Sequence, residues 1–178
     1  MQETGGKTQV LFDENQIRQM CKTLGEKITS DYKDKNLLVV SVLRGAMIFT
    51  ADLVRQIEVP MKLDCVITSS YGSSTQSSGD VNIIKDVDYD LTEFDILLVD
   101  DILDTGYTLK KLIEHFSAKK PKSLKTCVFL SKPDRREVDI DADYLAKEVP
   151  DYFLIGYGLD YAEKYRNLPY ITVLVGEK

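Results

Sequence analysis

The chain has 178 residues, of which 43% are hydrophobic and 29% are charged, and its formal net charge is −6 at pH 7. This length is enough for one domain with a sizeable apolar core, and we expect a single domain over residues 1–178. The negative net charge argues against nonspecific binding to nucleic acid, which needs a basic surface.

Apolar residues alternate between strand-like runs and helical spacing along the chain. In order, we expect a strand at 9–12, a helix at 14–32, a strand at 37–42, a helix near 47–56, a strand at 62–69, a strand at 96–99, a helix from 108, and strands at 124–130, 152–157 and 171–175. Strands that alternate with helices indicate an α/β fold, with a parallel sheet flanked by helices and connected by right-handed crossovers.

The segment from Leu97 to Thr108 is the most informative part of the sequence. An apolar strand ends in the adjacent acids Asp100 and Asp101, and Asp104 follows before a Thr-Gly-Tyr-Thr turn that leads into a helix. In open α/β sheets, ligands bind at this end of the strands. Like charges about 4 Å apart repel by about 4 kcal/mol near a protein surface, so a cation among these acids is favoured. Mg²⁺ suits such carboxylates.

The turn itself has the opposite chemical character. Backbone N–H groups at a glycine-containing turn and a helix N-terminus bind phosphate well. Thr105 and Thr108 add hydroxyl donors. Carboxylates for sugar hydroxyls and metal therefore lie beside donors for a phosphate, which predicts a Mg²⁺-assisted site for a phosphorylated sugar.

Residues 97–108 resemble the phosphoribosyl-diphosphate-binding motif of type I phosphoribosyltransferases. Three further segments, at 41–45 (SVLRG), 69–72 (SSYG) and 156–161 (GYGLDY) with Arg166, are similar to those of the hypoxanthine-guanine phosphoribosyltransferases, in the order found in that family. The resemblance implies a Rossmann-like core with a small hood formed by the N- and C-terminal segments. It also implies purine salvage: transfer of the 5-phosphoribosyl group from phosphoribosyl diphosphate to N9 of hypoxanthine, and of guanine, giving IMP or GMP and diphosphate with Mg²⁺ as cofactor.

Site residues follow from the same resemblance, position by position. The implied phosphoribosyl contacts are Asp100, Asp101, Asp104, Thr105, Gly106, Tyr107 and Thr108. The implied diphosphate contacts are Arg44, Gly45, Ser70, Tyr71 and Arg166, with a loop at about 70–80 that closes over the reacting centre. The implied purine contacts are Lys132, Phe153, Leu154 and Asp160, and the implied metal ligands are Asp100, Asp101 and Asp160.

Particular roles can be stated for some of these residues. Asp104 is the implied general base that accepts the purine N7 proton, and Lys132 the implied partner of the 6-oxo group, because an ammonium offers only donors. Phe153 is implied to stack on the base. The resemblance also implies a cis peptide bond between Leu43 and Arg44, and a homodimer or homotetramer. Many family members carry Glu where this chain has Asp100.

Other interpretations are weaker. Gly5-Gly6-Lys7-Thr8 lacks the first glycine and the preceding strand of a P-loop, and the paired acids lie too far along the chain for a response-regulator receiver. A regulator with the same fold that binds ligand or RNA without turnover is a further alternative, although Asp104 and Lys132 favour an enzyme. The basic runs at 119–122 and 135–136 are interpreted as solvated surface, because little aromatic interleaving accompanies them.

The cysteines and the N-terminus favour a cytoplasmic location without membrane contact. Cys21, Cys65 and Cys127 are too dispersed for a disulfide framework or a metal cluster. The N-terminal residues include Glu3 and Lys7 without an apolar run, and no segment has the length of about 18 apolar residues that a membrane span requires.

Overall fold

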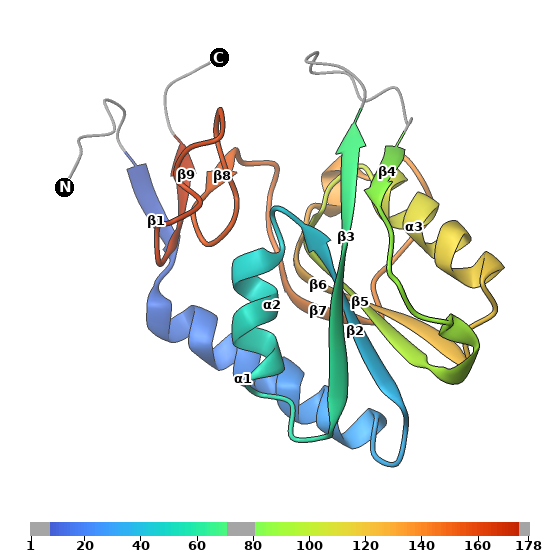
Figure 1. The fold of residues 1–178 in the computed structure, drawn as a ribbon. Helices are drawn as coiled ribbons and strands as arrows, with labels where there is room; N and C mark the ends of the chain where they lie inside the picture. Colours follow the sequence, from blue (N-terminus) through green and yellow to red (C-terminus); the bar gives the residue numbers. More distant parts are fainter. Residues whose placement is uncertain (1–7, 71–80, 175–178) are drawn as a thin grey trace.

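The structure is a computed structural model that describes residues 8–70 and 81–174 (Figure 1). Its α-helices are α1 (Glu14–Asp31), α2 (Met47–Val54) and α3 (Tyr107–Ala118), and two 3-10 turns lie at Leu91–Glu93 (η1) and Pro133–Arg135 (η2). Its strands are β1 (Thr8–Phe12), β2 (Leu37–Leu43), β3 (Met61–Ser70), β4 (Val81–Lys85), β5 (Asp95–Leu103), β6 (Ser123–Ser131), β7 (Tyr144–Glu148), β8 (Leu154–Ile155) and β9 (Ile171–Leu174).

Six strands form the central sheet, in the order β4-β3-β2-β5-β6-β7. The pairs from β3 to β7 are parallel, and β4 runs antiparallel to β3 at one edge. The expected α/β fold with a parallel sheet is therefore confirmed, with an antiparallel edge strand that the sequence pattern did not indicate. The carboxyl ends of β2, β5 and β6 lie next to one another because these strands are neighbours and parallel.

A second, antiparallel sheet has the order β1-β9-β8. It joins the two ends of the described chain, and it lies beside α2 and above one end of α1 (Figure 1). This sheet is the hood expected from the terminal segments. The loop from Gly156 to Tyr170 reaches back toward the central sheet, where Gly158 lies against the Gly45 carbonyl oxygen.

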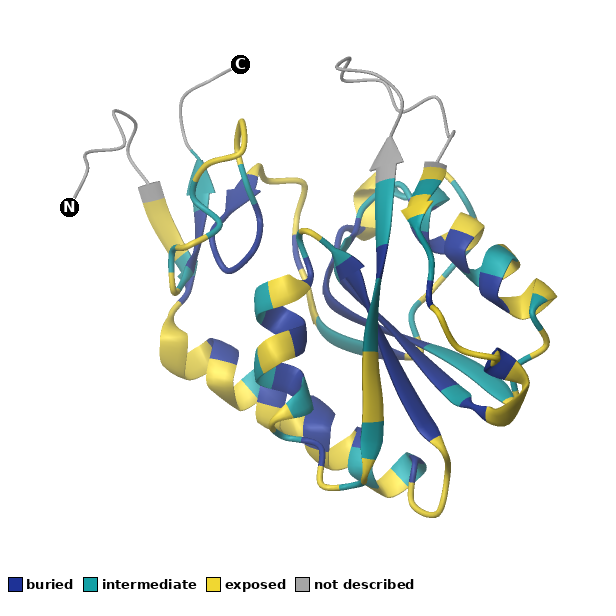
Figure 2. Ribbon diagram, viewed as in Figure 1, coloured by how far each residue is buried: buried dark blue, intermediate teal, exposed yellow. Residues whose placement is uncertain are grey.

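The helices bury the two faces of the central sheet. Val39, Leu97 and Val99 pack in one core cluster with residues of α1 and α2, whereas Leu38, Val40 and Leu98 pack in the other with residues of α3. Alternate residues of a strand point to opposite faces, so strands buried on both sides read as continuous apolar runs. Figure 2 shows this burial along β2 and β5. Helix α1 begins at a capping box formed by Asp13 and Gln16.

Several boundaries differ from the sequence prediction for physical reasons. Strand β5 continues to Leu103, past the expected end at 99, because its pairing with β6 continues to Leu103 opposite Ser131. Strand β8 is only two residues long, since the positive φ angles from Gly156 to Gly158 are incompatible with an extended strand. Strands β4 and β7 were not predicted.

No helix in the described part of the chain has the length and apolarity needed to cross a membrane. The loop expected at about 70–80 falls on residues 71–80, which lie outside the described residues, and so does position 175 of the expected last strand.

Candidate active site

Two adjacent carboxylates, Asp100 and Asp101, lie near the carboxyl end of strand β5. Asp100 pairs with Val128 of β6 inside strand β5 and is only 8% exposed. Its Oδ1 accepts a hydrogen bond from the N–H of Asp101 at 3.0 Å, and Asp101 Oδ1 accepts one from the N–H of Ile102 at 2.8 Å. Both acids thus lie within the strand, not after it as the sequence pattern indicated.

Burial makes this pair a strong attractor for a cation. Desolvation and the negative charge of Asp101 raise the pKa of Asp100 well above its usual range. Desolvation also raises the pKa of Asp101, although the bonds from Asp100 and Ile102 and the charge of Arg166 act against this increase. Within residues 8–70 and 81–174, no Lys or Arg forms an ion pair with either carboxylate. A buried acid beside a partly buried one, neither with an ion-paired cation among the described residues, fits a hard divalent ion such as Mg²⁺.

The loop after β2 lies directly against these acids. A Cβ placed on Gly45 would come within 1.8 Å of Asp101 Oδ2, so a larger residue there would have to displace the Asp101 carboxylate from its present position. The peptide bond between Leu43 and Arg44 is cis, as expected. The Arg44 side chain is exposed and forms an ion pair with Glu163 at 3.0 Å. The structure therefore brings together the residues at 44–45 and Asp101, which were assigned to neighbouring parts of one substrate.

The turn that precedes α3 has the geometry of an anion site. Asp104, Thr105 and Gly106 follow β5, and the helix begins at Tyr107. Gly106 has a φ of +96°, and a Cβ there would lie 2.6 Å from Val138 Cγ2, so both conformation and space require glycine. The first N–H groups of a helix have no partner within it, and they point toward the space before the N-terminus. Thr108 is only partly buried, in the first turn of α3.

Asp104 is held by a basic segment that follows β6. Arg135 Nε donates to Asp104 Oδ1 at 2.8 Å. Arg136 donates to the carbonyl oxygens of Leu103, at 3.0 Å, and of Asp104. The interpretation of this run as solvated surface is confirmed for Arg135, which is 41% exposed, whereas Arg136 is partly buried; both residues also hold the segment that carries Asp104.

The residues assigned to the purine come from two elements. Lys132 follows β6 and is 8% exposed, and its Nζ lies 3.6 Å from Asp151 Oδ1. Phe153 is 52% exposed and packs edge-on against the ring of Tyr161, with 5.5 Å between the ring centroids. Leu154, opposite Val173, begins strand β8. An exposed aromatic ring beside the hood is available for stacking on a planar ligand.

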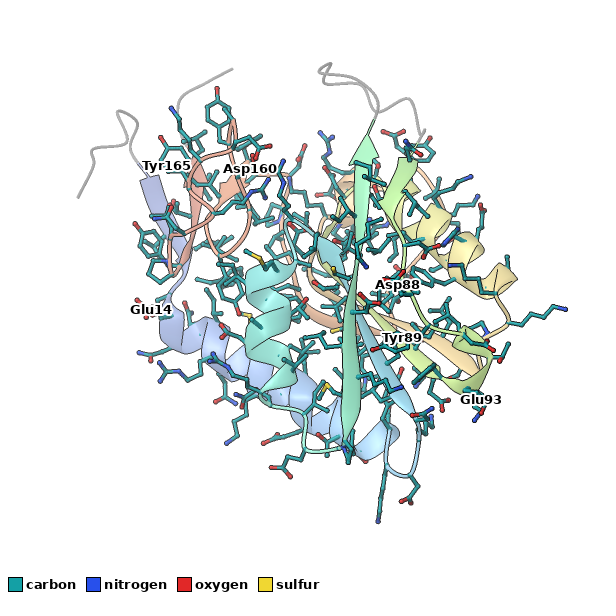
Figure 3. The ribbon with its side chains drawn as sticks, in the orientation of Figure 1. Glu14, Asp88, Tyr89, Glu93, Asp160 and Tyr165 are labelled. Carbon is teal, nitrogen blue, oxygen red and sulfur yellow. The ribbon has the colours of Figure 1, made fainter. Side chains whose placement is uncertain are left out.

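The hood loop contributes a second charged cluster. Asp160 lies on the loop after β8 (Figure 3), and Arg166 Nη2 approaches its Oδ1 at 2.8 Å. Arg166 Nη1 also donates to the carbonyl oxygen of Gly158 at 2.7 Å. A Cβ on Gly158 would come within 2.2 Å of the Gly45 carbonyl oxygen, so the hood loop touches the loop after β2. Arg166 and Asp160 are thereby brought close to position 45.

Two assigned residues are not described at the level of side chains. Ser70 ends β3, and Tyr71 lies outside the described residues, so their assignment to the diphosphate stays a prediction. In the part of the chain that the structure describes, no three His, Cys, Asp or Glu side chains form a group that could hold a metal ion. Mg²⁺ at the acids would therefore take further oxygen ligands from a substrate or water.

A cavity of about 630 Å³ lies elsewhere, between α1, α2 and residues 167–169. Cys21, Asp52 and Tyr157 are among its lining residues, and none of the assigned site residues lines it. The Tyr157 hydroxyl donates to Asp52 at 2.9 Å and lies 3.4 Å from Cys21 Sγ. We assign this cavity no part in the chemistry described above.

Sequence reasoning missed Arg135, Asp151 and Glu163, which pair with Asp104, Lys132 and Arg44 respectively. The partners in each pair are 19 to 119 positions apart in the sequence, so no local spacing reveals them. The positive φ of Glu163, at 63°, is likewise invisible in the sequence.

Comparison with known proteins agrees with this geometry. Residues 8–162 match the family model of the phosphoribosyl transferase domain. The chain is 50% identical over 165 residues to the hypoxanthine-guanine phosphoribosyltransferase of Bacillus subtilis, covering 93% of this chain and 92% of that protein. The crystal structure of a hypoxanthine phosphoribosyltransferase from Staphylococcus aureus has a TM-score of 0.90 at 44% identity, covering 93% of this chain and 90% of that one. A Trypanosoma cruzi hypoxanthine phosphoribosyl transferase also has a TM-score of 0.90, at 38% identity, with coverage of 98% and 94%.

Proposed function

The chain belongs to the phosphoribosyl transferase domain family, and from this premise we propose that it is a purine-salvage enzyme that makes IMP and GMP. It transfers the 5-phosphoribosyl group from phosphoribosyl diphosphate to N9 of hypoxanthine or guanine. The observation that carries this proposal is the arrangement of Asp100, Asp101 and the turn before α3 at one edge of the sheet, with Lys132 directly after the neighbouring strand β6.

The proposed reaction has a simple electron balance. The lone pair of purine N9 forms a bond to C1 of the ribose, and the bond from C1 to the diphosphate oxygen breaks with its electron pair on the diphosphate. The N7 proton of the base passes to the Asp104 carboxylate. Transfer thus needs a base near N7, and negative charge on the leaving diphosphate must be stabilised.

The chain offers groups for each of these needs. The N–H groups and hydroxyls at 105–108 bind the 5′-phosphate, and Asp100 and Asp101 bind the ribose hydroxyls. Arg44, the backbone at Gly45, and Arg166 bind the diphosphate. For this, Arg44 and Arg166 exchange their present acidic partners, Glu163 and Asp160, for phosphate oxygens.

Mg²⁺ bound at the paired acids, with the neutral ribose hydroxyls as further ligands, and a second ion at Asp160 would neutralise charge on the leaving diphosphate. Asp100 and Asp101 fit this role because they are adjacent, buried and partly buried respectively, and without an ion-paired cation among the described residues. The Asp at position 100, where many relatives carry Glu, keeps the charge on a shorter side chain.

Selectivity for 6-oxopurines is proposed to rest on Lys132. A buried ammonium can donate to the 6-oxo oxygen, whereas the exocyclic amine of adenine offers it no acceptor of comparable strength. Phe153 stacks on the base, and the backbone at Leu154 contacts its edge. Leu154 begins strand β8 of the hood sheet (Figure 1), and Phe153 directly precedes it.

We further propose a homodimer or homotetramer in the cytoplasm, formed by a single domain over residues 1–178. The three free cysteines suit a reducing compartment. The solved T. cruzi relative is one whose oligomeric state has been linked to its C-terminal region. Light scattering on purified protein tests this assembly, and a monomer at micromolar concentration would contradict it.

A spectrophotometric assay tests the function. Hypoxanthine, guanine, xanthine and adenine are each incubated with phosphoribosyl diphosphate and Mg²⁺, and nucleotide formation is followed by absorbance. We expect product with hypoxanthine and guanine, none with adenine, and loss of activity when EDTA removes the metal. A protein that binds phosphoribosyl diphosphate but forms no nucleotide would instead be a binding regulator.

A further inference from the structure

Arg135 occupies a position between the two groups proposed to contact the purine. Its Nε donates to Asp104 Oδ1 at 2.8 Å, and its Nη1 lies 3.8 Å from Asp151 Oδ2. The other oxygen of Asp151, Oδ1, lies 3.6 Å from Lys132 Nζ. A continuous row of alternating charges thus leads from Asp104 through Arg135 and Asp151 to Lys132.

The backbone on both sides of Arg135 is hydrogen-bonded to residues on both sides of Asp104, at the end of β5 and in the turn after it. The N–H of Lys132 donates to the Leu103 carbonyl oxygen at 2.9 Å, and the N–H of Glu137 donates to the Thr105 carbonyl oxygen at 3.0 Å. Arg136 adds hydrogen bonds to the same turn. Because these hydrogen bonds hold the backbone before and after Arg135, its guanidinium extends toward Asp104 from a fixed point of the chain.

The guanidinium is also suited to hold a carboxylate in one orientation. Arg135 and Asp104 are 41% and 39% exposed, so their ion pair contributes little to the free energy of unfolding. Its geometric effect is larger, because a planar guanidinium fixes the direction of the carboxylate it contacts. A base displaced by about 1 Å from its proton can lose about 100-fold in rate.

We propose that Arg135 is a positioning residue that orients Asp104 toward the purine N7 proton, and that Asp151 anchors both Arg135 and Lys132. The proposal rests on the proposed function, since it concerns the same base and the same purine. An ammonium has three N–H donors, so Lys132 can donate to the 6-oxo oxygen while it stays beside Asp151, which also lies beside Arg135. Recognition of the oxo group and orientation of the base are thereby linked through one carboxylate.

Arg135→Met tests this directly, because Met keeps an unbranched, apolar stem and lacks every donor. The rate of nucleotide formation is measured in a single turnover at saturating purine, so that slow product release does not mask the chemical step. We expect a fall of about tenfold, with the KM for phosphoribosyl diphosphate within about twofold of wild type.

The double variant with Asp104→Asn separates positioning from a general structural effect. If Arg135 acts through Asp104, Arg135→Met lowers the rate of the Asp104→Asn enzyme by less than about twofold. Likewise, Asp151→Asn lowers the single-turnover rate on its own and adds less than about twofold in the Arg135→Met background. Lys122→Met is the matched control: it breaks an exposed ion pair with Glu93 and is expected to leave the rate unchanged.

Three results would overturn the inference. The first is a wild-type rate in Arg135→Met, and the second is a further loss of about tenfold when Arg135→Met is added to Asp104→Asn. The third is a fully additive effect of Asp151→Asn in the Arg135→Met background. Absence of nucleotide formation by the wild-type protein is a different result, since it contradicts the proposed function before any variant is made.

Discussion

Gly45 and Asp101 lie so close that any side chain at position 45 would have to displace the Asp101 carboxylate: a Cβ there would stand 1.8 Å from Asp101 Oδ2 and 2.6 Å from its Cγ. Gly45 lies in the loop after β2, and Asp101 lies near the end of β5. Their contact joins the proposed diphosphate loop to the proposed ribose and metal site, so the Asp101 side chain restricts which residue can stand at position 45.

Gly45→Ala is expected to displace the Asp101 carboxylate and lower kcat/KM for phosphoribosyl diphosphate by about 100-fold. Steady-state kinetics with hypoxanthine measure the effect. Gly25→Ala is the matched control, because its Cβ would lie 2.4 Å from Gln56 Cβ, away from the site. It is expected to lower the melting temperature while folded protein keeps its activity. Normal kinetics in Gly45→Ala would contradict the proposed role of this contact.

Asp104→Asn removes the proposed base but keeps the size of the side chain. We expect the single-turnover rate to fall by about 100-fold or more, in the range that general bases contribute. Affinity for phosphoribosyl diphosphate, measured by calorimetry, should change little, because the 5′-phosphate and ribose contacts remain. Near-normal turnover would rule out Asp104 as the base.

Lys132→Gln tests the proposed contact with the 6-oxo group. Loss of a buried donor to this oxygen is expected to lower kcat/KM for hypoxanthine by about 100-fold. Lys125→Gln, on the strand β6 that precedes Lys132 and paired with Asp31 at 3.4 Å, is the control and should keep wild-type kinetics. Efficient use of adenine by the wild-type protein would contradict the selectivity argument.

A pH-dependent contribution to stability is expected from Asp86, which contacts His115 Nε2 at 2.8 Å and also Lys119. Burial raises the pKa of Asp86, but hydrogen bonds from Lys119, the N–H of Val87 and His115 together outweigh it and leave the pKa lowered. A carboxyl with a lowered pKa stabilises the fold above its unfolded pKa of about 3.9, and this contribution is lost as the pH falls through the folded value.

Asp86→Asn should therefore reduce the free energy of unfolding by about 1 kcal/mol at neutral pH, and by progressively less in acid below about pH 4. Urea unfolding across this range measures the difference. Asp88→Asn, at a side chain that is 92% exposed, is the control, for which we expect almost no difference at either pH. A constant loss from neutral to acidic pH for Asp86→Asn would contradict the assignment.

Much of the central sheet could be predicted from the sequence because its strands are buried on both faces. The apolar runs of β2, β5 and β6 and the helical face of α1, with buried Ile17, Cys21 and Leu24, are local signals. Strand β7 was missed because it has only five residues at a sheet edge, and their burial falls from buried Tyr144 to exposed Lys147 and Glu148 without the alternation of a typical strand. Its position depends on pairing with β6, which no local pattern encodes.

The acids and the turn at 100–108 could also be identified from sequence, since they are contiguous. Their partners could not. Arg135 reaches Asp104 only because the segment after β6 folds back across the end of β5, and Gly45 meets Asp101 only through the register of β2 against β5. Such contacts depend on tertiary packing, so only the structure reveals which cations and carboxylates form pairs.

We propose that one edge of the sheet holds the phosphate, ribose and base of a single purine nucleotide. A crystal structure with IMP and Mg²⁺ bound would show directly whether the nucleotide lies there. We predict that the 5′-phosphate binds the N–H groups of residues 105–108 and that the ribose hydroxyls contact Asp100 and Asp101. The 6-oxo oxygen is expected within hydrogen-bond distance of Lys132 Nζ. A nucleotide whose phosphate lies away from this turn, or whose oxo group does not meet Lys132, would contradict it.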